Sequence, residues 1–311
     1  MLALYIGLPL LLLIVVFLLF LLRIFRRTFY ASDAKKRNID IYDLPPGVPK
    51  GDPVMTELIR RFEARPYEPI TITAHDGTRL FGRYYHVKDG APVEVLCHGY
   101  HGMALRDLCG YNPLSLELSH NILLIDQRAA GESGGHVVSF GIRERFDICD
   151  WVDYLIGRFG EIPIFLVGIS MGGATVLMAG GDPLPAAVRG IIADCPYSTP
   201  ADIIMGVIRM MGLPPRPAFL LVRMAARIYG RFSLFEYTAK EAVARPGVPI
   251  LLLHGECDRL VPCDMSRELA AAAGDRATLH VFPGADHGMS CMSNPERYKK
   301  IVFDFINDCL A

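Results

Sequence analysis

The segment IFLVGISMGG, residues 164–173, decides the fold of this 311-residue chain. The apolar run Ile164–Ile169 has the length and composition of a buried strand, and the small residues after it predict a helix, Met171–Ala179. Ser170 therefore lies on a sharp turn between a strand and a helix. Gly168 and Gly172 complete the pattern G-x-S-x-G, which exposes a serine hydroxyl at the end of a strand and is typical of a nucleophile.

The same pattern occurs a second time, as GESGG at residues 131–135. Ser133 lies seven residues past Asp126, the end of the predicted strand Asn121–Asp126, and no helix signal comes after it. We therefore interpret Ser133 as a loop residue and Ser170 as the candidate nucleophile. Met171, at the start of the predicted helix, has a free backbone N–H and lies in the positive potential of the helix N-terminus.

Strand and helix patterns alternate on both sides of this segment. We expect further strands at Ile70–Ala74, Arg79–Val87, Val93–Cys97, Asn121–Asp126, Gly190–Ala193, Ile250–Leu253 and Leu279–Phe282. We expect helices at Val54–Ala64, Arg143–Phe159, Met265–Ala273 and Glu296–Cys309. Apolar strands separated by helices predict an α/β fold, with a mostly parallel sheet and helices on both faces. In such sheets the ligand binds beyond the carboxyl ends of the strands.

A serine needs a base to activate it, and the base needs a third group to orient it. His287 follows the strand Leu279–Phe282 and is the candidate base, and Asp258 follows the strand Ile250–Leu253 and is the candidate acid. Asp194 also ends a strand, so it is a rival for the role of the acid.

An oxyanion hole needs two N–H donors, and Met171 supplies one. The strand Val93–Cys97 leads into HGYHG at residues 98–102, where the backbone N–H of Tyr100 is the expected second donor. We interpret His98 as a residue that holds this loop. The predicted chemistry needs no metal and no organic cofactor.

The first residues differ from the rest of the chain. Leu2–Leu22 is 21 residues without a charge, long enough for a helix to cross a bilayer. Arg23, Arg26 and Arg27 end the run, where a cleaved signal peptide has small residues. We therefore expect a single-pass membrane anchor. The Lys and Arg residues all lie after the helix, which favours a cytoplasmic catalytic domain.

Composition limits the function classes. The formal net charge is −1, so the chain has no overall positive charge to attract nucleic acid. The 8 cysteines include no C-x-x-C pair, which is typical of reduced thiols. The oligomeric state stays open.

Five motifs together resemble the α/β-hydrolase superfamily from about Ile70 to the C-terminus. They are HGYHG (98–102), DQRAAGES (126–133), GISMGG (168–173), HGECDRLVP (254–262) and GADHG (284–288). The chain is similar to bacterial membrane-anchored hydrolases related to serine aminopeptidase and prolyl-oligopeptidase-like domains. The resemblance implies a triad of Ser170, Asp258 and His287 with Tyr100 and Met171 as oxyanion donors. The usual Asp-x-Arg-Gly-His-Gly reads Asp-Gln-Arg-Ala-Ala-Gly here, which puts the geometry of that loop in question.

The expected domains are an anchor (1–23), a proline-rich connector (24–69) and an α/β-hydrolase domain (70–311). A helical cap, about 198–245, interrupts the last of these, with arginines in excess over acidic residues. The cap is interpreted either as a packed lid with solvated arginines or as a basic amphipathic lid on anionic lipid. The expected reaction is hydrolysis of an ester or amide through an acyl-enzyme. A serine peptidase, an acyltransferase and a catalytically silent binding protein remain as alternatives.

Overall fold

Eight strands form one sheet in the order β1-β2-β4-β3-β5-β6-β7-β8 in the computed structural model, which describes residues 2–37, 40–42 and 52–311. β1 and β2 pair antiparallel, as do β2 and β4, and the remaining pairs are parallel. The strands are β1 (Glu68–Thr73), β2 (Arg79–Tyr85), β3 (Val93–Cys97), β4 (Asn121–Asp126), β5 (Ile164–Ile169), β6 (Val188–Asp194), β7 (Ile250–Gly255) and β8 (Ala277–Phe282). The predicted mostly parallel sheet is confirmed.

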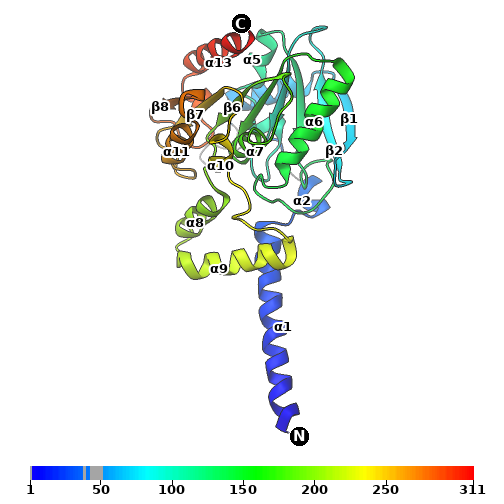
Figure 1. Ribbon diagram of the computed structural model, residues 1–311, viewed down its shortest axis with the longest axis vertical. Coiled ribbons are helices and arrows are strands. Elements are labelled where there is room, and N and C mark those ends of the chain that lie inside the picture. Colours follow the sequence, from blue (N-terminus) through cyan, green and yellow to red (C-terminus); the bar gives the residue numbers. More distant parts are fainter. Residues whose placement is uncertain (1, 38–39, 43–51) are drawn as a thin grey trace.

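Helices cover both faces of this sheet (Figure 1). One face packs against α6 (Glu144–Phe159), α7 (Met171–Ala179), α10 (Ala239–Val243) and α11 (Asp264–Ala273). The other packs against α3 (Pro53–Glu63), α4 (Ala104–Asp107), α5 (Asn112–Glu117), α12 (Ser290–Ser293) and α13 (Pro295–Leu310). Successive strand residues alternate between the two cores: in β5, Ile164 and Leu166 face the first, and Phe165 and Val167 the second.

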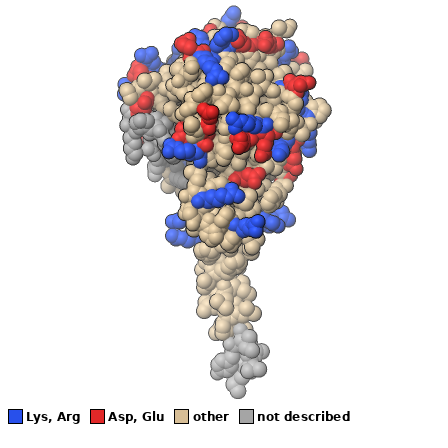
Figure 2. Space-filling model, turned by 90° about the vertical axis from the view of Figure 1, so that its left-hand side faces the viewer, with Lys and Arg blue, Asp and Glu red and all other residues tan. Residues whose placement is uncertain are grey.

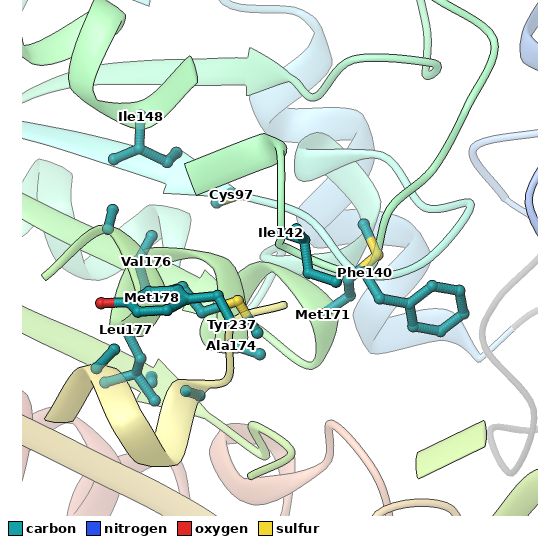
Figure 3. Close-up of a cluster of buried hydrophobic side chains, with 14 of the residues drawn as sticks. Cys97, Phe140, Ile142, Ile148, Met171, Ala174, Val176, Leu177, Met178 and Tyr237 are labelled. Carbon is teal, nitrogen blue, oxygen red and sulfur yellow. The ribbon is translucent and has the colours of Figure 1, made fainter. Parts of the chain in front are cut away.

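The helix α7 is buried along its whole length (Figure 3). Its small residues allow this close packing: a Cβ at Gly172 would lie 2.1 Å from the carbonyl oxygen of Cys97 on β3. Among the labelled residues of this cluster, Phe140 points away from the others, and it lines the cavity described below. The sequence thus sets the first turn of α7 directly against the end of a neighbouring strand.

The N-terminal helix α1 (Leu2–Thr28) projects from the body of the molecule (Figure 1). Within its segment Gly7–Thr28 an 18-residue window has a mean hydropathy of 3.0, so the helix is long and apolar enough to cross a membrane, a test that signal sequences also pass. The helix runs through residue 23, where the sequence predicts the end of the anchor. Leu21 and Phe25 in its last turns, and Phe29 directly after it, are buried in the core of the domain.

Of the two helices of the expected cap, α9 (Pro215–Ala225) packs against the base of α1, and α8 (Pro200–Met210) packs against α9 (Figure 1). A π-helical turn, Ala226–Gly230, continues α9, and the hydroxyl of Tyr229 in this turn donates to the carbonyl oxygen of Leu18. The short α2 (Asp33–Arg37) follows α1. Residues 38–39 and 43–51 of the predicted connector lie outside the described residues.

Candidate active site

Ser170 lies on the turn between β5 and α7 with φ 55° and ψ −118°, a conformation that costs a non-glycine residue energy. The neighbouring residues Gly168 and Gly172 have no room for a side chain. A Cβ at Gly168 would lie 2.3 Å from backbone atoms of Gly172. This strained turn directs the Ser170 side chain away from the helix and toward the carboxyl edge of the sheet.

Three predicted residues meet at that edge. The Nε2 atom of His287 lies 3.0 Å from the Oγ of Ser170, and its Nδ1 lies 2.7 Å from the Oδ2 of Asp258. The register explains the meeting, because Gly255 at the end of β7 pairs with Phe282 at the end of β8. The two loops that follow these paired ends therefore start side by side.

The carboxylate of Asp258 is fully buried and held at both oxygens. Its Oδ1 accepts the backbone N–H groups of Leu260 (2.9 Å) and Val261 (2.7 Å). Its Oδ2 lies 2.7 Å from His287 and 3.3 Å from the Nε2 of His254. Burial acts to raise the pKa of Asp258, but the hydrogen bonds from His254 and His287 outweigh it and hold the pKa well below its usual value. An ionised Asp258 can orient the imidazole of His287 and stabilise its protonated form.

Asp194, the rival acid, is engaged elsewhere. Its backbone carbonyl accepts the N–H of Ser170, and its side chain accepts the hydroxyl of Ser290 at 2.9 Å. Burial raises its pKa to about 6, although the hydrogen bond from Ser290 acts in the opposite direction. Neither ring nitrogen of His287 is bonded to Asp194.

The loop after β3 lies against the serine. A Cβ at Gly99 would lie 3.6 Å from the Cβ of Ser170, and the N–H of Gly99 donates to Asp107. His98 is buried and bonds to both the backbone of Gly99 and the backbone N–H of Gln127, so it holds this loop as the sequence predicts. Tyr100 lines the same cavity as Ser170, and the role of its backbone N–H as the second oxyanion donor stays a prediction.

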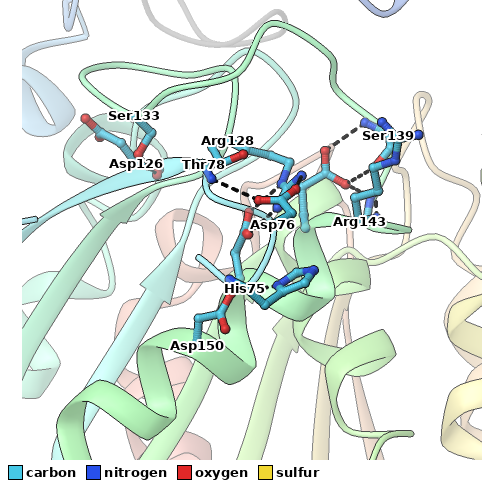
Figure 4. Close-up of polar contacts among 12 residues, drawn as sticks. His75, Asp76, Thr78, Asp126, Arg128, Ser133, Ser139, Arg143 and Asp150 are labelled. Carbon is cyan, nitrogen blue, oxygen red and sulfur yellow. Dashed lines mark hydrogen bonds and ion pairs between the residues drawn. The ribbon is translucent and has the colours of Figure 1, made fainter. Parts of the chain in front are cut away.

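The second G-x-S-x-G serine is part of a structural network (Figure 4). The hydroxyl of Ser133 is buried, donates to the carbonyl oxygen of Asp126 and accepts the N–H of Phe81. The loop that starts at residue 126 departs from the usual Asp-x-Arg-Gly-His-Gly motif. It is still held in place, because Arg128 binds both oxygens of Asp147 and also Asp76. The interpretation of Ser133 as a loop residue agrees with these contacts.

Two groups of side chains have the composition of a metal site among the described residues. Cys195 lies with Asp258 and His287, and His75 lies with Asp147 and Asp150. In the first group the atoms of Asp258 and His287 are hydrogen-bonded to protein groups, and burial raises the pKa of the Cys195 thiol, which disfavours the thiolate that a metal needs. In the second, Asp147 is bound to Arg128 and Asp150 to His75.

A cavity of about 620 Å³ opens beside Ser170. Its wall is apolar and comes from three parts of the chain: the base of α1, the cap helices α8 and α9, and the loops of the catalytic edge. The polar side chains that line it are Arg27, Thr28, Tyr100, Ser170 and Tyr197, so none of the described side chains in its lining is a carboxylate.

Sequence reasoning missed two features of the site. Asp286 binds Arg259 through side-chain and backbone groups and also accepts the N–H of His287, which ties the loop of the acid to the loop of the base. The second missed feature is the contribution of α1 to the core and to the cavity wall, since the sequence predicts only an anchor there. The signal was the spacing of Leu21, Phe25 and Phe29, which places one apolar stripe on the helix past the first arginine.

Comparisons with known proteins place the chain in one family. A family model described as "Alpha/beta hydrolase family" matches residues 95–301. The uncharacterized protein YqkD of Bacillus subtilis is 24% identical over 254 residues, 81% of this chain and 83% of its own. The uncharacterized protein YfhR of Salmonella typhi is 28% identical over 264 residues, with 78% and 82% covered.

Solved structures share the fold. The esterase Pf2001 of Pyrococcus furiosus has a TM-score of 0.66 at 20% identity, covering 85% of this chain and 97% of that one. Est1E of Butyrivibrio proteoclasticus, solved with ferulic acid bound, has a TM-score of 0.59, with 79% and 99% covered. The chain belongs to the alpha/beta hydrolase family.

Proposed function

We propose that this protein is a serine hydrolase that cleaves carboxylic esters through an acyl-enzyme formed on Ser170. The observation that carries the proposal is the continuous hydrogen-bonded series from Ser170 through His287 to Asp258, with distances of 3.0 and 2.7 Å. Nucleophile and base within hydrogen-bond reach, with the base oriented by a third group, is the arrangement that activates a serine. The esterases among the structural neighbours point to the same chemistry.

In the proposed mechanism His287 takes the Ser170 proton through Nε2 as Oγ attacks the ester carbon. Asp258 keeps the Nδ1–H of the imidazole directed at its own Oδ2 and stabilises the imidazolium. The N–H groups of Met171 and Tyr100 would bind the oxyanion. His287 then protonates the leaving alcohol, and a water molecule activated by the same histidine releases the acid and restores Ser170.

The lining of the cavity favours esters with an apolar acyl group over peptides. An aminopeptidase must bind a charged α-amino group, and the lining of this cavity, over the part of the chain that the structure describes, includes no carboxylate to pair with one. Apolar walls from the cap and α1 suit a hydrocarbon chain. We therefore expect short- to medium-chain p-nitrophenyl esters to react faster than aminoacyl or prolyl amides.

Covalent labelling tests the nucleophile. Ser170→Ala should abolish labelling by a fluorophosphonate probe and lower ester turnover by about 10⁶-fold. Ser133→Ala removes the serine of the second motif and serves as the matched control, which should still be labelled. Labelling that persists in Ser170→Ala and disappears in Ser133→Ala would exclude the proposal.

We also propose that α1 remains attached to the mature protein as a single-pass anchor, with the catalytic domain in the cytoplasm. Cleavage of α1 as a signal peptide would remove Leu21 and Phe25 from the core of the domain. It would also remove Ile24 and Thr28 from the wall of the cavity. A segment built into the core and the cavity is poorly suited to removal.

A further inference from the structure

One wall of the cavity beside Ser170 belongs to the membrane helix. Phe20, Ile24, Arg27 and Thr28 recur on one face of α1, and all four line the cavity. Opposite them, α9 contributes Ala218, Leu221 and Val222 among others, and α9 packs directly against α1. The space that leads to Ser170 is therefore bounded by a helix that continues into the bilayer when it serves as an anchor.

The length of α1 places this wall at the bilayer surface. From Leu2 to Phe20 a helix rises about 28 Å, close to the roughly 30 Å of a hydrocarbon core. With that segment in the bilayer, Phe20 lies at its edge, half exposed to the outside and also part of the cavity lining. The hydroxyl of Tyr229 binds the carbonyl oxygen of Leu18, so the π-helical turn after α9 lies at the same depth.

The cap has the surface of a lipid-facing element. Exposed apolar side chains gather on the turn between α8 and α9 and along α9, namely Met210, Met211, Leu213 and Leu220, with Met211 65% exposed. Between Asp202 and Glu236 the cap contains five arginines and no acidic residue. On the face shown in Figure 2, Lys and Arg side chains lie at the base of the body, where the apolar helix joins it. Apolar side chains ringed by arginines are typical of a surface in contact with anionic lipid.

Arg27 brings this positive charge to the cavity itself. It is exposed, it lines the cavity, and no carboxylate among the described residues forms an ion pair with it. An arginine at the boundary between an apolar cavity and the membrane surface is suited to an anionic headgroup.

We propose that the substrate is an acyl ester resident in the bilayer, whose hydrocarbon chain enters the cavity between α1 and α9 and whose anionic headgroup contacts Arg27. This inference rests on the proposed ester hydrolysis at Ser170. The acyl group is transferred from the ester oxygen to the Oγ of Ser170, and the headgroup alcohol leaves with the proton from His287. Water then releases the fatty acid. The products are one carboxylic acid and one alcohol, so no co-reactant other than water is consumed.

The test uses the full chain reconstituted in vesicles that contain only one kind of ester. The host lipids are ether-linked phosphatidylcholine and ether-linked phosphatidylglycerol, which contain no acyl ester and fix the surface charge. The reporter is mono-oleoyl phosphatidylglycerol, compared with mono-oleoyl phosphatidylcholine, and the readout is released oleate. Hydrolysis of water-soluble 4-methylumbelliferyl acetate by the same vesicles reports the triad separately.

Two pairs of variants probe the wall of α1. Ile24→Trp fills the cavity from α1 and should lower the ratio of oleate release to acetate hydrolysis by about tenfold, whereas Leu19→Trp, on an exposed position outside the cavity lining, should leave the ratio unchanged. Arg27→Gln should lower the preference for the anionic over the zwitterionic reporter by about tenfold, the value of one charge-assisted hydrogen bond. Arg26→Gln removes the same charge outside the cavity lining and should keep the preference.

The outcomes separate this inference from the proposed function. Acetate hydrolysis that depends on Ser170, together with no oleate release from vesicles, overturns the bilayer substrate and leaves the esterase standing. Equal losses in Ile24→Trp and Leu19→Trp, with fluorophosphonate labelling intact in both, overturn the entry route along α1. Equal preferences in Arg27→Gln and wild type overturn the headgroup contact. Acetate hydrolysis that survives in Ser170→Ala overturns the proposed function itself.

Discussion

The phenol of Tyr100 donates a hydrogen bond of 2.7 Å to the carbonyl oxygen of Thr28. Thr28 is the last residue of α1, where helix carbonyls lack intrahelical partners, so the bond satisfies one of them. Tyr100 is also the proposed second oxyanion donor through its backbone N–H. Its ring stacks on Phe140, with ring centroids 5.1 Å apart. The end of α1 is thus bonded directly to the loop that would stabilise the transition state.

Tyr100→Phe tests whether this bond positions the loop. The variant keeps the ring and the backbone N–H and loses only the bond to Thr28, worth about 1 kcal/mol. We expect kcat for a soluble ester to fall by about threefold to tenfold with little change in KM, because a displaced N–H acts mainly on the transition state. Tyr229→Phe is the matched control, since it removes a similar bond to α1, to Leu18, far from the oxyanion loop. Equal kinetics in Tyr100→Phe and wild type would contradict this role.

Gly172→Ala should disable the site more severely. The added Cβ would lie 2.1 Å from the carbonyl oxygen of Cys97 and 2.5 Å from that of His98, and both are backbone atoms that cannot move independently of the loop. We expect a loss of activity of more than about a hundredfold together with a lower melting temperature. Gly206→Ala on α8 is the control, because no atom lies within 4 Å of its Cβ and alanine stabilises a helix by roughly 0.5–1 kcal/mol. Melting curves and esterase kinetics of both variants check this prediction.

Asp258→Asn should lower turnover by about 10⁴-fold, because an amide no longer holds His287 in the productive tautomer. Asp194→Asn should have a mild effect, since Asp194 bonds to Ser290 and not to His287. Steady-state kinetics on a p-nitrophenyl ester decide between the two acids. A large loss of turnover in Asp194→Asn, together with near-normal turnover in Asp258→Asn, would assign the role of the acid to Asp194 at the end of β6.

Sequence patterns predicted most of this arrangement because the relevant signals are local. Ser170, Asp258 and His287 each follow an apolar strand directly, and parallel strands end at the same edge of a sheet. The role of Ile24 and Arg27 depends instead on where α1 packs against the domain, a long-range contact that hydropathy does not encode. The clamp between Arg259 and Asp286 was missed for the same reason, since it joins loops that follow two different strands.

The buried carboxyl of Asp194 should make stability depend on pH. Its pKa is raised to about 6 by burial, whereas an aspartate in an unfolded chain has a pKa of about 3.9. The folded state therefore binds a proton that the unfolded state releases, so this contribution is complete below about pH 4 and is lost as the pH rises through about 6. We expect the free energy of unfolding of the wild type, relative to Asp194→Asn, to fall by up to about 1.4 kcal/mol per pH unit between these values. Denaturant unfolding of both proteins across this range measures it, and parallel pH profiles would show that Asp194 is not responsible.

Topology is the remaining prediction, and it follows from the charges next to α1. Arg23, Arg26 and Arg27 all lie at the C-terminal end of the apolar run. Positive charges near a membrane helix are retained on the cytoplasmic side, so the catalytic domain should be cytoplasmic.

Protease treatment of bacterial spheroplasts that express the full chain with a C-terminal tag checks this orientation. We expect the tag to be protected in intact spheroplasts, digested after lysis, and recovered with the membrane fraction at the mass of the uncleaved chain. Digestion without lysis would place the domain outside and overturn the charge argument. A shortened soluble product would instead identify α1 as a cleaved signal, and the cavity would then lose the wall that Phe20, Ile24 and Arg27 provide.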